Sequence, residues 1–597
     1  MTPLSRRLGL ALMLIFSMVT RADEPAPVES IEGPNGQRIV GRLVGDPATG
    51  FQFKPAGAES ALRLAPNLLI SFAGPKLPAN VIPPPFRVEL GLAQRISGRL
   101  AGIDSEGITL VDGPGGAKVT VRRPGATALV QRIGEVQILA DPFERLETGR
   151  WTRVGTPEVV DEPRLDGMKS LALPAEGASL TTKLDDPISS GRLDVGFFDD
   201  GKVVSGHEFF VDLLFRSPTG PQSVRAILGW DEESLAVVSP GGPALSVQRL
   251  ARRPGWHRLT IEFGPDATVL SVDGDLLAKG KGTGGPLSEL RLATSKTGQT
   301  ATIPRLAAHF DDLRLVRFAE SVPGVEIDPR QDEVRTVLGD QLFGKVLSGT
   351  PAGITLGLDG KAFALGWSEV AGLHFQREAI QGAAVEGLLV RARWRTGPSD
   401  SPNDLDEAEG ALTQLTDTTL SLATPYAGTL TIPRNRMVGL LVLGLGRRIV
   451  IDGTAHHLGN EVTKREPFLD PPQPEGGKLQ RTFTLESVPN ADAFAVLDVL
   501  LVVGESGTPT FSSFVKKGEL RTKASMNGQE FDFLNRHIFD KNEKPQRIRM
   551  PIPPGVLKVG ANVLRLEQFG RVDDPAELDD LGILTIAIEF VAPATRR

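Results

Sequence analysis

Short runs of alternating apolar and polar residues, separated by glycine and proline, follow one another along most of the chain. Alternation with a period of two, as in WHRLTIEF at residues 256–263, predicts strands with one buried face. Asp273-Gly274 and Asn527-Gly528 separate such runs, and both pairs favour the two-residue turn of a β-hairpin. The chain is therefore expected to be all-β, and its 597 residues suffice for several domains.

One pattern recurs along the chain. Residues 38–45 read RIVGRLVG and residues 95–102 read RISGRLAG, and less similar copies follow at 341–348 and 409–415. The four recurring glycines are Gly41, Gly98, Gly344 and Gly410. Each copy reads as about five short strands, and glycine inside a strand usually marks a bulge or a sharp bend. In strand count and glycine placement the copies resemble SH3-like or Sm-like barrels, which implies small five-stranded barrels.

The central region resembles concanavalin-like and laminin-G-like lectin sandwiches. A strand that begins with Trp256 precedes the hairpin Val272-Asp273-Gly274, and the region ends in a strand after Asp311-Asp312-Leu313. The resemblance implies a β-sandwich of the jelly-roll type and does not identify a ligand.

The C-terminal region resembles galactose-binding-like β-sandwiches that occur as accessory modules. The matching residues are Asn527-Gly528, Leu557, Gly560, Asn562, Leu564 and Asp579-Asp580. This resemblance implies a second sandwich of the jelly-roll type.

The first residues have the pattern of a signal peptide. Arg6 and Arg7 precede an apolar run at 8–19, and the small residues Thr20 and Ala22 suit a cleavage site. The run is too short to span a bilayer comfortably, so we expect an exported chain with no transmembrane segment in its mature form. Its compartment is expected to be the periplasm, the cell surface or the medium.

The expected modules are arranged like beads on a string. They are a signal peptide at 1–22, barrels at 23–78 and 79–140, a concanavalin-like sandwich at 141–320, barrels at 326–380 and 381–446, and a galactose-binding-like sandwich at 447–597.

Charge and composition exclude several kinds of chemistry. The net charge is −7 with no basic block, which argues against a nucleic-acid partner. The chain has no cysteine, so thiol catalysis and thiolate metal sites are excluded. GKGTGG at 280–285 matches a dinucleotide-binding pattern, but Pro286 and a strand-like segment follow it where a helix would be required.

Catalytic carboxylates are not predicted. Retaining glycosidases need two carboxyl groups about 5–5.5 Å apart. The nearest arrangement is HEFFVDLLF, in which Glu208 and Asp212 share one face of a strand but lie about 13 Å apart along it. We interpret them as surface acids that flank a core strand.

Binding residues are only weakly indicated. Candidates for ligand contact are His207, Trp230 and Asp231, and candidates for a metal are Asp199 and Asp200. No cofactor is predicted; calcium would be the cation for these acidic positions, but the sequence gives it no support. His456-His457 would point to opposite faces of a strand, which argues against one shared ion.

Taken together, the patterns favour an exported, non-catalytic binding or scaffold protein. Its expected ligand is carbohydrate or another polymer of the cell envelope, and its other expected partner is an envelope protein. The alternatives are a purely structural envelope protein and, less favoured, a glycoside-active enzyme.

Overall fold

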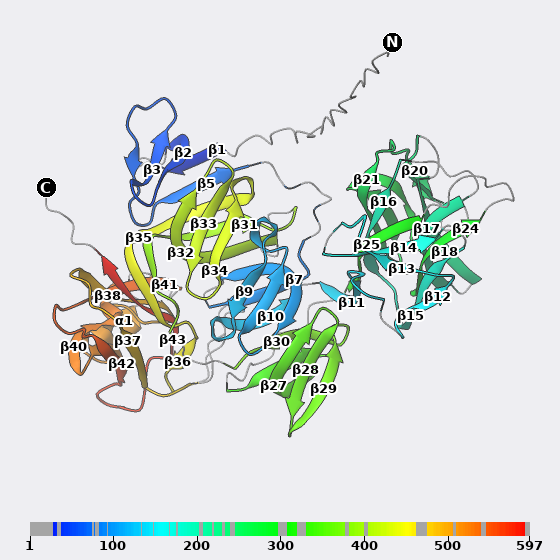
Figure 1. Cartoon of the computed structure of the whole chain (residues 1–597). Coiled ribbons are helices and arrows are strands. Elements are labelled where there is room, and N and C mark those ends of the chain that lie inside the picture. Colours follow the sequence, from blue (N-terminus) through cyan, green and yellow to red (C-terminus); the bar gives the residue numbers. More distant parts are fainter. Residues whose placement is uncertain are drawn as a thin grey trace, which may run out of the picture.

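The structure is a computed structural model (Figure 1). It describes residues 28–32, 37–74, 77, 81, 83–91, 94–132, 134–146, 149–165, 167–174, 177–201, 207–217, 220–229, 233–238, 245–296, 307–318, 330–376, 381–398, 404–460, 474–505, 509–538 and 545–591. The expected signal peptide, Trp230, Asp231 and the side chain of His207 lie outside the described residues.

The all-β, multidomain fold class is confirmed. The described α-helix, α1 (Pro509–Lys517), was not predicted, because SSFVKK lies between strand-like runs. Within the described residues no helix has the length and apolarity needed to cross a membrane.

Four groups of strands have the same pairing order, in which the fifth strand pairs with the first, and the first to fourth pair in sequence. Barrel 1 is β1 (Val28–Glu32), β2 (Arg38–Asp46), β3 (Gly50–Pro55), β4 (Leu62–Arg63) and β5 (Leu69–Ala73). Barrel 2 is β6 (Phe86–Leu90), β7 (Arg95–Ile103), β8 (Gly107–Val111), β9 (Val119–Arg122) and β10 (Ala126–Gln131). Barrel 3 is β26 (Asp332–Thr336), β27 (Gln341–Thr350), β28 (Gly353–Leu358), β29 (Lys361–Gly366) and β30 (Val370–His374). Barrel 4 is β31 (Val385–Arg395), β32 (Leu405–Leu415), β33 (Thr419–Thr424), β34 (Gly428–Pro433) and β35 (Met437–Asp452).

The recurring glycine allows the third strand of each barrel to lie close to the second. A Cβ atom at Gly41 or Gly410 would lie 2.3 Å from a main-chain carbonyl oxygen of the third strand; the distance would be 2.8 Å at Gly98 and 2.5 Å at Gly344. In barrels 2, 3 and 4 the register shift falls two to four residues after this glycine, for example between Leu100 and Gly102, and β2 and β3 of barrel 1 pair without a shift. The glycine therefore serves close backbone approach, and the expected bulge lies elsewhere.

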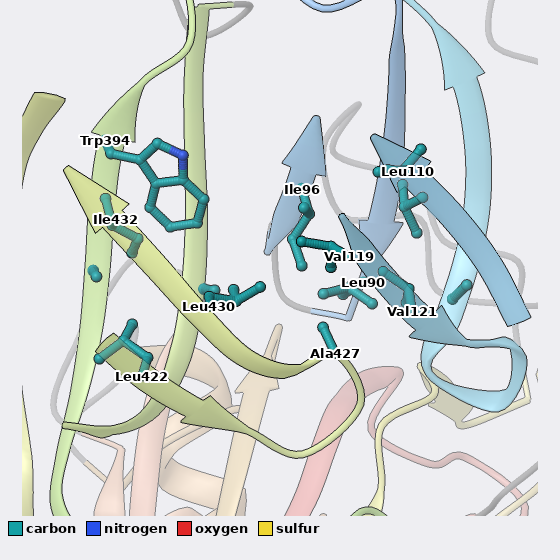
Figure 2. Packing of buried hydrophobic residues seen from close by; sticks show 14 of the residues in the cluster. Leu90, Ile96, Leu110, Val119, Val121, Trp394, Leu422, Ala427, Leu430 and Ile432 are labelled. Atoms are coloured by element: carbon teal, nitrogen blue, oxygen red, sulfur yellow. The ribbon is translucent and has the colours of Figure 1, made fainter. Parts of the chain in front are cut away.

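The barrels are paired in a nested order, the first with the fourth and the second with the third. In each pair the fifth strands form the contact, β5 with β35 and β10 with β30. The expectation of separate beads is wrong for the barrels, because one cluster of buried apolar side chains extends through all four. Figure 2 shows Leu90 and Ile96 of barrel 2 facing Ala427 and Leu430 of barrel 4 within this core.

The same arginine contact joins both pairs. Arg434 of barrel 4 binds the carboxylate of Glu29 (2.6 Å) and the carbonyl of Leu43 (2.7 Å) in barrel 1, while Glu29 also accepts the Leu43 amide. In the other pair, Arg123 of barrel 2 binds the Asp332 carboxylate and the Val346 carbonyl of barrel 3, and Asp332 accepts the Val346 amide. Both acids lie directly opposite the recurring glycine of their barrel, Gly41 and Gly344.

The central sandwich consists of two antiparallel sheets around an apolar core. The larger, sheet C, has the order β13 (Glu158–Val160), β14 (Ser170–Pro174), β25 (Ala307–Phe318), β16 (Gly191–Asp199), β21 (Gly255–Phe263), β22 (Ala267–Val272), β23 (Asp275–Lys281) and β20 (Leu245–Val247), and β11 (Glu135–Asp141) also pairs with β25. The other, sheet D, has the order β12 (Thr152–Val154), β15 (Ser179–Ile188), β24 (Leu287–Lys296), β17 (His207–Ser217), β18 (Gly220–Leu228) and β19 (Ala236–Val238). β11 lies within the range expected for barrel 2, but it pairs with β25 of the sandwich.

The C-terminal sandwich shares a strand with barrel 4. The 16-residue β35 pairs with β31 and β5 in its first part and with β43 (Leu581–Val591) near its end. In this sheet β43 pairs with β36 (His456–Leu458) and β38 (Asp492–Leu500), and β38 pairs with β41 (Gln546–Ile552). The second sheet has the order β37 (Lys478–Leu485), β42 (Gly560–Phe569), β39 (Arg521–Met526) and β40 (Gln529–Phe533).

The two predicted hairpin turns have positive φ at both central residues. The values are 52° and 83° at Asp273-Gly274 and the same at Asn527-Gly528.

Candidate functional site

Three aromatic side chains form a row across the outer face of sheet C. Trp256 on β21 lies directly opposite Phe198 on β16, and Phe198 lies directly opposite His309 on β25. The ring centroids are 5.5 Å apart for Phe198 and Trp256, with planes at 57°, and 6.3 Å apart for Phe198 and His309, with planes at 86°. All three side chains are half-buried, so the row borders solvent. We call these residues the aromatic row.

The strand period explains why these rings face outward. On β16 the odd-numbered Leu193, Val195 and Phe197 face the core, so Phe198 takes the opposite face. On β21 the core residues are Leu259 and Ile261, and Trp256 is out of phase with them. The sequence shows this offset of Trp256, but the alignment with Phe198 and His309 depends on strand register.

A glycine and a leucine border the row. Gly196 is the next outward position on β16, and Leu165 of a preceding loop packs on it, since a Cβ at residue 196 would lie 2.6 Å from Leu165 Cδ2. The Leu165 amide donates to Asp311 Oδ2 at 2.9 Å, which fixes the loop on the sheet. Leu165 therefore covers Gly196 and forms an apolar wall on this side of the row, and it is 37% exposed.

His309 belongs to the row as a neutral ring. Burial lowers the pKa of His309 and outweighs the opposing effect of the exposed Asp200 carboxylate. Near neutral pH the imidazole is uncharged, so all three rings offer uncharged aromatic surface.

A buried histidine supports the strand that carries Trp256. His257 Nδ1 lies 2.7 Å from Asp273 Oδ2, and its Nε2 lies 2.6 Å from the carbonyl of Arg253. Burial would lower the pKa of His257, but the hydrogen bonds to Asp273 and to the Arg253 carbonyl outweigh it and raise the pKa. The protonated ring thus ties the start of β21 to the β22–β23 hairpin.

The two metal candidates, Asp199 and Asp200, are adjacent residues at the end of β16, and their surroundings differ. Asp199 accepts two hydrogen bonds from Arg252, at 2.8 and 2.6 Å, and one from the Gly201 amide. Asp200 is exposed at the end of β16. Over the part of the chain that the structure describes, no group of three or more His, Asp or Glu side chains is arranged to hold a metal ion.

Sheet D carries the two acids tested as a catalytic pair. Glu208 and Asp212 lie on β17 with Phe210 between them on the same face, and Arg225 pairs with Asp212 at 2.7 Å. The Phe210 ring is 2% exposed and lies 4.2 Å from the guanidinium carbon of Arg225. An apolar ring therefore occupies the position between the acids, and Asp212, which was expected at the surface, is 2% exposed and paired with Arg225.

The two adjacent histidines have separate partners. His456 bonds to Asp452 and Glu475, each at 2.9 Å, whereas His457 lies 3.2 Å from Asp580. As expected for neighbours on a strand, they do not converge on one point.

The start of β32 and the residue before it form a contact between barrels that the sequence did not predict. Asp404 pairs with Arg132 at 2.6 Å, and Asp406 accepts hydrogen bonds from the amide and hydroxyl of Ser97, both at 2.7 Å. Burial raises the pKa of Asp406 to about 6, against the hydrogen bonds from Ser97. The segment therefore fastens barrel 4 to barrel 2.

Glu409, further along β32, fastens barrel 4 to the C-terminal sandwich. It pairs with Arg448 at 2.8 Å, Arg547 at 2.9 Å and Arg391 at 2.6 Å. Burial would raise its pKa, but the three guanidinium groups hold the pKa of Glu409 well below its usual range. Beside Glu409 and Tyr426 lies a pocket of about 40 Å³, which has room for a few water molecules.

No protein-family model and no curated protein sequence matches the chain. Among solved structures, the chain is similar to the β-glucanase of Bacillus licheniformis, with 13% identity over 30% of this chain and 96% of that one and a TM-score of 0.23. It is similar to the endo-β-1,3-glucanase of Pyrococcus furiosus, with 13% identity over 36% and 99% and a TM-score of 0.26. A third similar structure is a protein of unknown function with a galectin-like fold from Bacillus subtilis, with 9% identity over 31% and 97% and a TM-score of 0.23.

Proposed function

We propose that the chain is an exported, non-catalytic binding or scaffold protein whose central sandwich binds a polysaccharide across the aromatic row. The observation that carries the proposal is the alignment of Trp256, Phe198 and His309 on three neighbouring strands. The C–H faces of pyranose rings are apolar, and they stack on aromatic surface of this kind. The ring spacing of 5.5 to 6.3 Å is similar to the length of one sugar unit.

Sheet D supports the non-catalytic part of the proposal. Phe210 stands between Glu208 and Asp212, and Arg225 neutralises Asp212, so the two acids are not poised for acid and nucleophile roles. Phe210 is buried, so its ring is not available for stacking. The aromatic row on sheet C is therefore the favoured site.

The test is affinity gel electrophoresis and calorimetry of the full chain against a panel of neutral and acidic polysaccharides. Trp256→Ala is expected to weaken binding at least tenfold, while Phe318→Ala is the control on β25 of the same sandwich, away from the row. Phe318 is 37% exposed, so its loss should leave both folding and binding unchanged.

Absence of binding to every polysaccharide would overturn the proposal and favour the purely structural alternative. Equal affinity of the Trp256→Ala and Phe318→Ala variants would move the site away from the row. Turnover of mixed glucans that is lost in Glu208→Gln or Asp212→Asn would instead establish the enzyme alternative.

A further inference from the structure

The four barrels differ in what lies against the free edge of their fourth strand. In barrel 1 this strand, β4, has only 2 residues. In barrels 2 and 4 the fourth strands β9 and β34 lie beside each other, and the Arg122 amide at the end of β9 donates to the Tyr426 carbonyl at 2.9 Å. In barrel 3, β29 has 6 residues, its first 4 side chains are exposed, and among the described residues it pairs with β28 alone. Figure 1 shows β27 to β29 projecting from the rest of the molecule, with β29 outermost.

The hairpin before β29 determines which backbone groups are free. Asp359 and Gly360 have φ of 48° and 76° and close a two-residue turn between the paired Leu358 and Lys361. Hydrogen-bonded and non-hydrogen-bonded pairs alternate from that turn, so Ala362 and Ala364 direct their N–H and C=O groups away from β28. The next such amide, that of Gly366, is already bound by Glu369 Oε2 at 2.9 Å.

We propose that a second copy of this chain adds to this edge, with the two β29 strands antiparallel about a two-fold axis at Phe363. Because this two-fold axis is perpendicular to the sheet, side chains on the core-facing side of one β29 lie opposite side chains on the core-facing side of the other. It places Phe363 opposite Phe363 of the second copy, and Ala362 opposite Ala364. The outward N–H and C=O groups of the two alanines then complete two reciprocal pairs of hydrogen bonds.

The charges and the exposed apolar surface of β29 are compatible with pairing to the β29 strand of a second copy. The register places Lys361 opposite Leu365 of the second copy, next to the exposed Glu369, so each end of the joined strands gains a pair of opposite charges. Phe363 is 45% exposed at the edge. Among the described residues only β28 pairs with β29, and an apolar edge that is open in this way favours pairing with another strand.

The contact is expected to be weak. It involves one short strand on each side and buries less surface than the roughly 1,200 Å² of a stable interface. A dimer should therefore form in a concentration-dependent manner.

Cysteine crosslinking tests the register directly, because the chain has no cysteine of its own. Opposed residues of a non-hydrogen-bonded pair have Cα atoms about 4.5 Å apart, within the roughly 4.4–6.8 Å range of disulfides. Phe363→Cys in the full chain should therefore give a covalent dimer under mild oxidation. Leu338→Cys is the control, since Leu338 is 88% exposed in the same barrel but distant from the edge.

Sedimentation of the chain without substitutions should show a monomer–dimer equilibrium. Phe363→Lys, which sets like charges opposite each other, and Ala364→Pro, which removes an outward N–H, should each give a monomer, while Leu338→Lys should not. A monomer at every concentration, or equal crosslinking at residues 363 and 338, would overturn the proposal. If the chain is a monomer and the amides of Ala362 and Ala364 are nevertheless protected from hydrogen exchange, the proposal is also overturned. Another segment of the same chain would then pair with this edge.

Discussion

At the scale of single residues, buried charges in this protein join modules. Glu29, Asp332, Asp404 and Glu409 are each at most 6% exposed, and each receives an arginine from another module. Removal of one partner from such a pair is costly because the remaining charge stays buried. Asp406 is the exception, since its direct partner is the uncharged Ser97.

Asp406→Asn is expected to stabilise the barrels at neutral pH. The folded-state pKa of about 6 lies above that of an unfolded aspartate, so stability falls as pH rises between about 4 and 6, by roughly 3 kcal/mol at most. The variant should therefore be more stable than the unsubstituted chain above about pH 6, and this difference in the free energy of unfolding should vanish below about pH 4. Thermal unfolding across this range measures it, with Asp417→Asn, an exposed position of barrel 4, as control.

His257→Gln is expected to destabilise the central sandwich in a pH-dependent manner. Because the folded pKa of His257 is raised, its stabilising contribution is complete below the ordinary histidine value near 6.5. It is lost as pH rises through the folded value. The difference in melting temperature between the two proteins should therefore shrink as pH rises above the ordinary histidine value; a constant difference would contradict the assignment of a charged ring.

At the scale of elements, the strand period accounts for much of what the sequence predicted. It predicted the all-β class and the Asp273-Gly274 and Asn527-Gly528 hairpins. Phe198 and His309 were not predicted as partners of Trp256, because their alignment depends on pairing between strands far apart in sequence. The role of the recurring glycines also depends on a neighbouring strand, whose carbonyl occupies the place of a side chain.

Two glycines of β7 provide a matched test of that role. A Cβ at Gly98 would lie 2.8 Å from both Leu110 Cβ and the Val111 carbonyl, whereas at Gly102 its nearest contact would be 3.6 Å away. Gly98→Ala is expected to cost about 1–3 kcal/mol through overpacking, and Gly102→Ala to be nearly neutral. Chemical denaturation of both variants is the measurement, and equal stabilities would contradict the close-approach explanation.

At the scale of the whole molecule, the order of the barrels along the chain differs from their order in space. Barrel 1 pairs with barrel 4, and barrel 2 with barrel 3, with the central sandwich inserted between the second and third. Local patterns cannot predict this nesting, because the contacts that define it join residues such as Arg434 and Glu29, 405 positions apart. The C-terminal sandwich is joined to the barrels through the shared strand β35.

Arg434→Met tests the outer pair. The substitution leaves Glu29 buried without a cation and is expected to cost about 3–5 kcal/mol, while Glu29→Gln in the same chain should restore part of the loss. Limited proteolysis should then cleave barrel 1 faster in the single variant than in the double variant. Wild-type resistance in the single variant would show that the β5–β35 pairing alone holds barrel 1.

The nested pairing sets an order of events during synthesis. A ribosome adds roughly 5–20 residues per second, so the β5 edge of barrel 1 waits tens of seconds or longer before β35 exists. Barrels 2 and 3 can meet sooner, since Arg123 and Asp332 are only 209 positions apart. The nascent chain therefore exposes an unpaired strand edge in its N-terminal barrel during most of its synthesis. An unpaired edge can pair with a wrong strand, so we expect misassembly, and its prevention by chaperones, to concern barrel 1 first.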